Sequence, residues 1–105
     1  MKPNYKPPFA TFVKKQRKPL QLVIEDAVEE VCTDPTIGEA KTGDLQGIWV
    51  YKFTHNRQQY LMAYRPASAD ELNREDVDID LLFIDFYQIG THENFYVSLK
   101  KYLKS

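Results

Sequence analysis

Cysteine is nearly absent from this 105-residue sequence, and Cys32 alone cannot form an intrachain disulfide. A chain without disulfides suits a reducing compartment, so we expect a cytoplasmic protein. We interpret Cys32 as a structural thiol, because no second cysteine or nearby histidine suggests a nucleophile. The longest apolar runs, such as residues 81–84, are far too short to span a bilayer, and the N-terminus lacks an apolar segment of signal-peptide length. We therefore expect neither a membrane span nor a targeting signal.

Motifs for phosphate cofactors and metals are also missing. None of the four glycines belongs to a dinucleotide fingerprint or a Walker loop, and this absence argues against ATP-dependent chemistry. Two histidines and one cysteine cannot assemble a zinc site. Asp76, Asp78 and Asp80 have the spacing of the first EF-hand ligands, but Leu81 and Tyr87 stand where that loop needs glycine and glutamate. We therefore expect no cofactor and no metal, and we interpret this acidic run as an exposed strand edge.

The chain as a whole has no excess of positive charge, but one of its segments does. Fourteen basic and fifteen acidic residues give a net charge of −1, unlike most nucleic-acid-binding proteins. Residues 1–24 nevertheless hold only basic charges, whereas residues 70–85 hold acidic residues and Arg74 alone among basic ones. The two segments can be two solvated faces, or the first can be a basic surface that meets phosphate.

The length allows one domain, 1–105, with a single core. Three prolines within residues 1–8 predict an irregular start. Apolar residues at spacings of three and four predict a helix over residues 8–16 and a longer one from Pro19 to the Asp34–Pro35 pair. Residues 36–47 are expected to form a loop.

The second half of the sequence is typical of strands. Residues 48–54 and 59–65 are rich in β-formers, and the four residues between them suit a hairpin. After a polar connection over residues 66–75, alternation predicts a strand that runs to Ile89, followed by a helix over residues 94–103. The fold class is therefore α+β: two N-terminal helices packed on an antiparallel sheet, with a short C-terminal helix.

The strongest candidate for chemistry is His92, which follows the most apolar strand. Imidazole can give or take a proton near neutral pH, and Glu93 and Tyr96 are close enough in sequence to orient it. A lone histidine at a strand end can equally be a structural hydrogen-bonding group. The residue types alone leave both interpretations open.

Several segments are similar to the RelE/ParE superfamily of bacterial toxins from type II toxin–antitoxin pairs, and the likeness covers residues 9–105. These segments are Asp34, Pro35 and Gly38; Gly43, Asp44, Leu45 and Gly47; residues 60–64; and residues 90–96. Gly90, Thr91 and His92 resemble the ending of YafQ-like toxins, where that family places a catalytic histidine.

The resemblance implies a metal-independent, ribosome-dependent mRNA endonuclease that inhibits translation, with a cognate antitoxin as its partner. The implied chemistry is attack of a ribose 2′-hydroxyl on the adjacent phosphate, which needs proton transfer and cationic stabilisation. The implied roles fall on His92 as acid or base, on Lys52 and Arg65 as phosphate contacts and on Tyr96 as base-stacking or hydrogen-bonding support. By their position on predicted strands, Lys52 and Arg65 can equally be strand-end residues whose charges are solvated. Phe95, Arg57 and His55 are the implied further substrate contacts.

Three features differ from the usual RelE-like pattern. Leu61 stands where many of these nucleases carry arginine, the chain is not basic, and no strand is evident before the first helix. A related branch keeps the scaffold but acts without catalysis by binding DNA gyrase, which is the alternative function. A small interaction module that has lost its toxicity is the third possibility.

Overall fold

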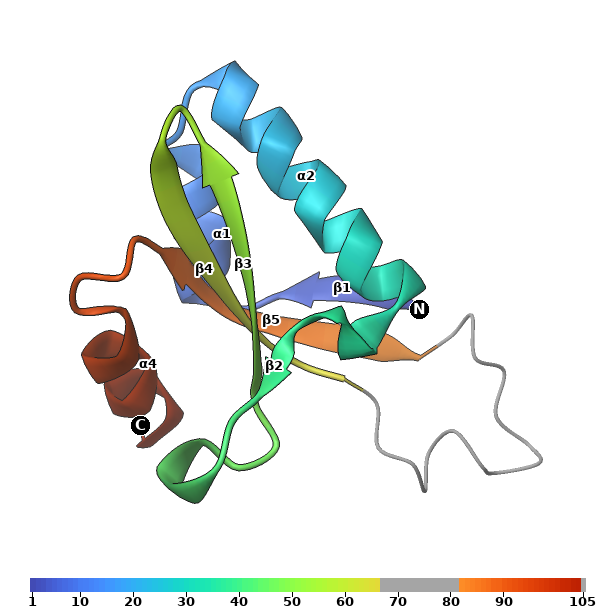
Figure 1. Ribbon diagram of the computed structural model, residues 1–105, viewed down its shortest axis with the longest axis vertical. Coiled ribbons are helices and arrows are strands. Elements are labelled where there is room, and N and C mark those ends of the chain that lie inside the picture. Colours follow the sequence, from blue (N-terminus) through green and yellow to red (C-terminus); the bar gives the residue numbers. More distant parts are fainter. Residues whose placement is uncertain (67–81, 105) are drawn as a thin grey trace.

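The computed structural model describes residues 1–66 and 82–104, which form an α+β domain around a five-stranded sheet of order β1-β5-β4-β3-β2 (Figure 1). The expected fold class is confirmed. Its elements are β1 (Lys2–Tyr5), α1 (Pro7–Lys14), α2 (Lys18–Thr33), β2 (Glu39–Ala40), β3 (Trp49–His55), β4 (Gln58–Arg65), β5 (Phe83–Gly90) and α4 (Phe95–Lys104), with two short 3-10 helices, η1 (Pro35–Ile37) and η2 (Gly43–Leu45).

The expectation of an irregular start was wrong, because residues 2–5 form β1. This strand pairs in parallel with β5, from Lys2 opposite Phe83 to Tyr5 opposite Phe86, and makes the sheet mixed rather than purely antiparallel. The amide of Lys2 donates to the carbonyl of Leu82, just before β5, and the amide of Lys6 donates to the carbonyl of Phe86 in β5, both at 2.9 Å. Pro3, which has no amide hydrogen, lies between these donors on an edge strand, where a missing donor is tolerated.

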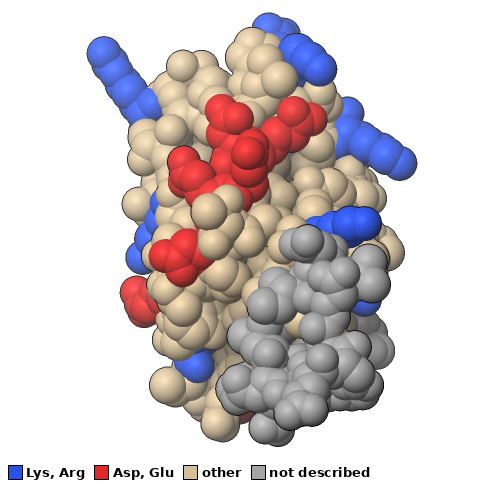
Figure 2. Space-filling view, turned by 90° about the vertical axis from the view of Figure 1, so that its right-hand side faces the viewer, with Lys and Arg blue, Asp and Glu red and all other residues tan. Residues whose placement is uncertain are grey.

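Both N-terminal helices lie where the sequence predicts them. Prolines occupy the first turns of α1 and α2, positions where their lack of an amide hydrogen costs nothing. The apolar stripe of α2 is buried, and its acidic residues form the opposite, exposed face. Figure 2 shows these acidic side chains gathered on the molecule's surface, with Lys and Arg side chains near the upper end, where α2 begins.

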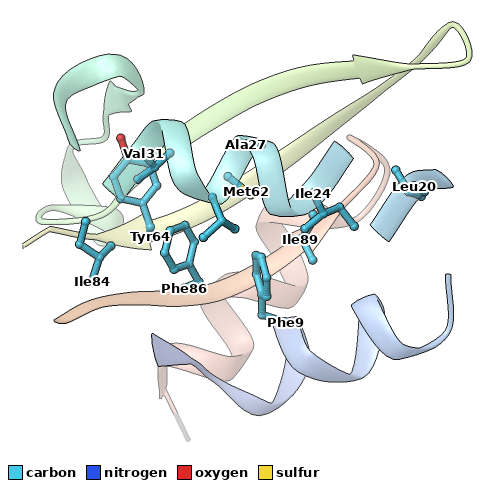
Figure 3. Close-up of a cluster of buried hydrophobic side chains, with 11 residues drawn as sticks. Phe9, Leu20, Ile24, Ala27, Val31, Met62, Tyr64, Ile84, Phe86 and Ile89 are labelled. Atoms are coloured by element: carbon cyan, nitrogen blue, oxygen red, sulfur yellow. The ribbon is translucent and has the colours of Figure 1, made fainter. Parts of the chain in front are cut away.

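The sheet separates two apolar clusters. The first lies between the sheet and helices α1 and α2, and Figure 3 shows it: Phe9, Leu20, Ile24, Ala27, Val28, Val31, Met62, Tyr64, Ile84, Phe86 and Ile89. The second lies under α4: Leu45, Ile48, Val50, Leu61, Ala63, Phe95 and Leu99. Residues 61–64 of β4 alternate between the two clusters, as the period of a strand requires, so this strand is buried on both faces.

The predicted β3–β4 hairpin is confirmed, with a tighter turn than expected. His55 pairs with Gln58, which leaves only Asn56 and Arg57 in the turn. Both have positive φ, 50° and 67°, as in the two-residue turns that match the twist of the strands. The turn therefore projects Arg57 from the tip of the hairpin.

The last predicted strand and helix are present as β5 and α4. The N-terminal half of that strand, with Asp76, Asp78 and Asp80, and nearly all of the polar connection before it lie outside the described residues. A register shift between Ala63 and Tyr64 gives β5 one extra residue. Tyr87 packs against the second cluster and the Gln88 amide donates to the carbonyl of Phe95, so both side chains face α4.

A buried hydroxyl attaches the loop after α2 to the sheet. Tyr64 is fully buried, and its Oη donates to the carbonyl of Pro35 at 2.6 Å and accepts from the amide of Gly38 at 3.1 Å. Burial is the main reason why the pKa of Tyr64 is raised. A Cβ on Gly38 would lie 2.5 Å from this Oη and 2.9 Å from the carbonyl oxygen of Val50. The loop therefore needs glycine at this close approach.

Tyr64→Phe should lower the free energy of unfolding by about 1–3 kcal/mol, because the carbonyl of Pro35 and the amide of Gly38 lose a buried partner. Urea denaturation measures the change. Tyr60→Phe is the matched control: its hydroxyl makes no hydrogen bond to the described residues, and we expect a change within about 0.5 kcal/mol. Equal stabilities of Tyr64→Phe and the control would contradict the role of this hydroxyl.

Candidate functional site

Tyr96, in the first turn of α4, is the centre of a small surface cluster. The ring of His92 meets it edge-on, with centroids 6.0 Å apart, and Lys41 Nζ lies 5.4 Å from its ring centroid. Phe95 packs perpendicular to it at 5.2 Å. His92 is exposed and Tyr96 is half-buried, whereas Phe95 is only 2% exposed. Tyr96 is therefore the aromatic residue of the pair that a base can reach.

The turn between β5 and α4 places His92 beside Tyr96. Asn94 has a φ of 60°, a conformation that asparagine tolerates better than most residues. The amide of Phe95 donates to the carbonyl of His92 at 3.2 Å, and the Gln88 side chain donates to the carbonyl of Phe95 at 3.0 Å. Because Phe95 is also anchored in the second cluster, the turn has little freedom to move His92 away.

Lys41 is a site residue that the sequence analysis missed. It follows β2, and its Nζ donates to Glu39 Oε1 at 2.9 Å in the one ion pair found among residues 1–66 and 82–104. This hydrogen bond is the main reason why the pKa of Lys41 is raised and that of Glu39 is lowered. The spacing of two residues puts both on one face of a strand, but only the pairing of β2 with β3 identifies that strand.

Lys52 lies on the same face of the sheet as this ion pair. It is exposed on β3, in a cross-strand row with Leu61 and Gly90. Its charge contributes to the lowered pKa of Glu39, after the larger effects of Lys41. Lys41 and Lys52 therefore form a cationic pair around Glu39, next to Tyr96.

Arg65 lies at some distance from Lys52. It is exposed on the same face, four residues along β4 from Leu61, the partner of Lys52. At about 3.3 Å per residue, the two cations are about 13 Å apart along the sheet. Leu61 and Ala63, which α4 covers, lie between them. Lys52 and Arg65 are therefore too far apart along the sheet to contact one phosphate group together.

His55 and Arg57 lie at the hairpin end, apart from the cluster around Tyr96. His55 shares the face of Tyr51 and Phe53, which pack against the first apolar cluster. The structure thus brings His92, Tyr96, Lys41 and Lys52 to one region and places His55 on the other face of the sheet.

A model of the family described as ParE-like toxins of type II bacterial toxin–antitoxin systems matches residues 4–100. The chain belongs to this family. A search of curated proteins finds no significant match. The resemblance to the RelE/ParE superfamily is confirmed, and a type II toxin has a cognate antitoxin as its partner.

Other surface features of the toxin have a structural explanation. A hollow of about 600 Å³ beside α2 is lined by Asp26, Glu29, Glu30 and Tyr51, and Tyr51 Oη donates to Glu30 Oε2 at 2.5 Å. This hydrogen bond is the main cause of the raised pKa of Tyr51. Burial raises the pKa of the half-buried Cys32 thiol, which makes it a poor nucleophile.

The described part of the toxin has neither a cluster of metal ligands nor a membrane-spanning helix. Its histidine, cysteine and carboxylate side chains form no group of three that could hold a metal ion. No helix within residues 1–66 or 82–104 is long and apolar enough to cross a membrane.

Lys41→Gln should raise the pKa of Glu39 toward its ordinary value of 4.5, because the ammonium that favours the carboxylate is removed. Carbon-13 NMR of the side-chain carboxyl groups measures the titration. The pair stabilises the folded toxin above the ordinary pKa, and this effect is lost as the pH falls through the lowered value. Lys101→Gln, on exposed α4, should leave Glu39 unchanged. Identical Glu39 titrations in both variants would contradict the conclusion that Lys41 lowers the pKa of Glu39.

Proposed function

We propose that this toxin is a metal-independent, ribosome-dependent mRNA endonuclease that inhibits translation. The observation that supports this function best is the contact of the exposed His92 ring with Tyr96. The ammonium group of Lys41 lies over the same Tyr96 ring. This arrangement combines a proton carrier, an aromatic surface and cationic groups in one region.

The proposed reaction is attack of a ribose 2′-hydroxyl on the neighbouring phosphorus. The hydroxyl gives its proton to a base, the new P–O2′ bond forms and the P–O5′ bond breaks, and the leaving 5′-oxygen takes up a proton. The products are a 2′,3′-cyclic phosphate and a 5′-hydroxyl. His92 serves as one of the two proton carriers, since imidazole is effective as acid or base near neutral pH.

The other residues hold the RNA and its developing charge. Lys52 stabilises the phosphoryl oxygens, and Lys41 adds positive charge from its position between Glu39 and Tyr96. Tyr96 stacks on a base, because its ring lies at the surface. Phe95 supports Tyr96 from the core. Arg65 binds the phosphate of a different nucleotide, since it lies too far along the sheet to share one with Lys52.

One specific observation favours the alternative, a toxin that acts by binding DNA gyrase without catalysis. Leu61 stands where many RelE-like nucleases carry arginine, and it is fully buried under α4. This position therefore offers no cation to a phosphate, and the net charge of −1 also departs from the usual basic nuclease.

His92→Ala should reduce mRNA cleavage on translating ribosomes by about 10² or more, because a positioned acid or base contributes about this factor. Primer extension on the mRNA maps and quantifies the cuts. Val97→Ala is the control: Val97 is 68% exposed on the same helix, and we expect unchanged cleavage. Wild-type cleavage by His92→Ala would remove this residue from the mechanism.

Two further assays of the wild-type toxin distinguish the nuclease from the other two possible functions. Inhibition of DNA supercoiling by gyrase, with no RNA cleavage, would replace the nuclease by the gyrase-binding alternative. Absence of growth arrest when the wild-type chain is expressed in a bacterial host would indicate a module that has lost its toxicity.

A further inference from the structure

A second hollow lies between the junction of α1 with α2 and the tip of the β3–β4 hairpin, which are side by side in Figure 1. Its volume is about 650 Å³. Lys15, Gln16 and Arg17 line one side, and His55, Asn56 and Tyr60 line the other. We call this hollow the hairpin groove. It contains none of the residues that surround Tyr96.

No acidic residue is among the described residues that line the hairpin groove. These lining residues lie within residues 15–20 and 55–60. The surrounding stretches 1–24 and 45–66 contain no aspartate or glutamate. Lys14, Lys18 and Arg57 lie next to the lining residues in sequence and add to the charge. Neither Lys15 nor Arg17 takes part in an ion pair with the described residues. The groove is thus basic although the chain as a whole is slightly acidic.

Packing holds the groove in shape. The ring of Tyr60 stacks on Phe53 with centroids 5.6 Å apart and meets Phe12 edge-on at 6.3 Å. The side chains of Gln16 and Gln21 donate to the carbonyls of Phe12 and Val13 at 3.0 and 2.8 Å, which closes the C-terminal end of α1. Lys15 and Arg17 therefore project from a fixed corner.

The edge of the sheet connects the groove with the cluster around Tyr96. His55 lies three residues along β3 from Lys52, about 10 Å, on the opposite face. Within the described residues, β2 pairs only with Trp49 and Val50, so the outer edge of β3 beyond them is open. A chain that contacts Lys52 can pass around this edge to the groove.

We propose that the hairpin groove binds the phosphate backbone of single-stranded RNA, as a second contact apart from His92. The proposal rests on the proposed function in one respect, that RNA is the molecule on which the toxin acts. Ammonium, guanidinium and imidazole groups donate hydrogen bonds to phosphate oxygens, and the amide side chains of the groove can bond to ribose hydroxyls. The contact is independent of sequence, because the groove offers charge rather than a pattern for base edges.

Binding of a fluorescein-labelled single-stranded RNA of mixed sequence tests the proposal by fluorescence anisotropy. All proteins carry His92→Ala, so that affinity is measured independently of cleavage. Adding Lys15→Gln and Arg17→Gln should weaken binding by about tenfold or more. The slope of log affinity against log salt should become shallower by about 1.4, because each single-strand phosphate contact contributes about 0.7.

The matched control removes two exposed lysines of α4, Lys101→Gln with Lys104→Gln, which changes the net charge equally. It should retain the affinity and the salt slope, as should the exchange of Lys15→Arg with Arg17→Lys. Equal losses in the control and the groove variant would overturn the proposal, since net charge alone would then explain binding.

Two other occupants of the groove give different results. Displacement of the RNA by adenosine monophosphate at similar concentration would overturn the proposal in favour of a free nucleotide. A groove variant that binds RNA like the wild type but has lost affinity for the cognate antitoxin would overturn it in favour of an antitoxin contact. A toxin that binds RNA through the groove but cuts no mRNA would refute the proposed endonuclease function alone.

Discussion

The structure depends on the burial of β4 on both faces. Met62 and Tyr64 face the N-terminal helices while Leu61 and Ala63 face α4, and all four are fully buried. One short chain must therefore supply covering helices for two sides of one sheet, and it does so with its two ends. The N-terminal helices close one face, and the C-terminal helix closes the other (Figure 1).

This division decides where the functional groups lie. Because α4 is fixed to the sheet through Phe95 and Leu99, its first turn holds Tyr96 and the preceding His92 at a defined place beside the strand edge. On the opposite face, the Tyr64 hydroxyl fixes the loop that leads into β2 and thus the position of Lys41. The surface cluster is supported by both cores, so a change in either core alters its geometry.

Acidic and basic side chains are separated around α2. Acidic side chains cover the exposed face of this helix (Figure 2). Lys15 and Arg17, which precede it, line the hairpin groove. A net charge near zero therefore hides two surfaces of opposite sign. The basic one can attract phosphate.

Local patterns determined much of this protein. The 3.6-residue period of α2, the Asp34–Pro35 pair that ends it and the β-rich segments around residues 55–58 are encoded within a few neighbouring residues, and each is present as expected. Strand β1 was not predictable in this way, because its only support is a parallel partner about 80 residues later, and Pro3 within it and Pro7 and Pro8 after it argue against a strand. The position of Lys41 was not predictable for the same reason. Lys41 follows the two-residue strand β2, which is recognised only through its pairing with β3. The sequence by itself determined the helices, the hairpin and the family, whereas contacts between distant segments alone decided which charged side chains meet, because such contacts follow from burial of the whole sheet and not from any local period.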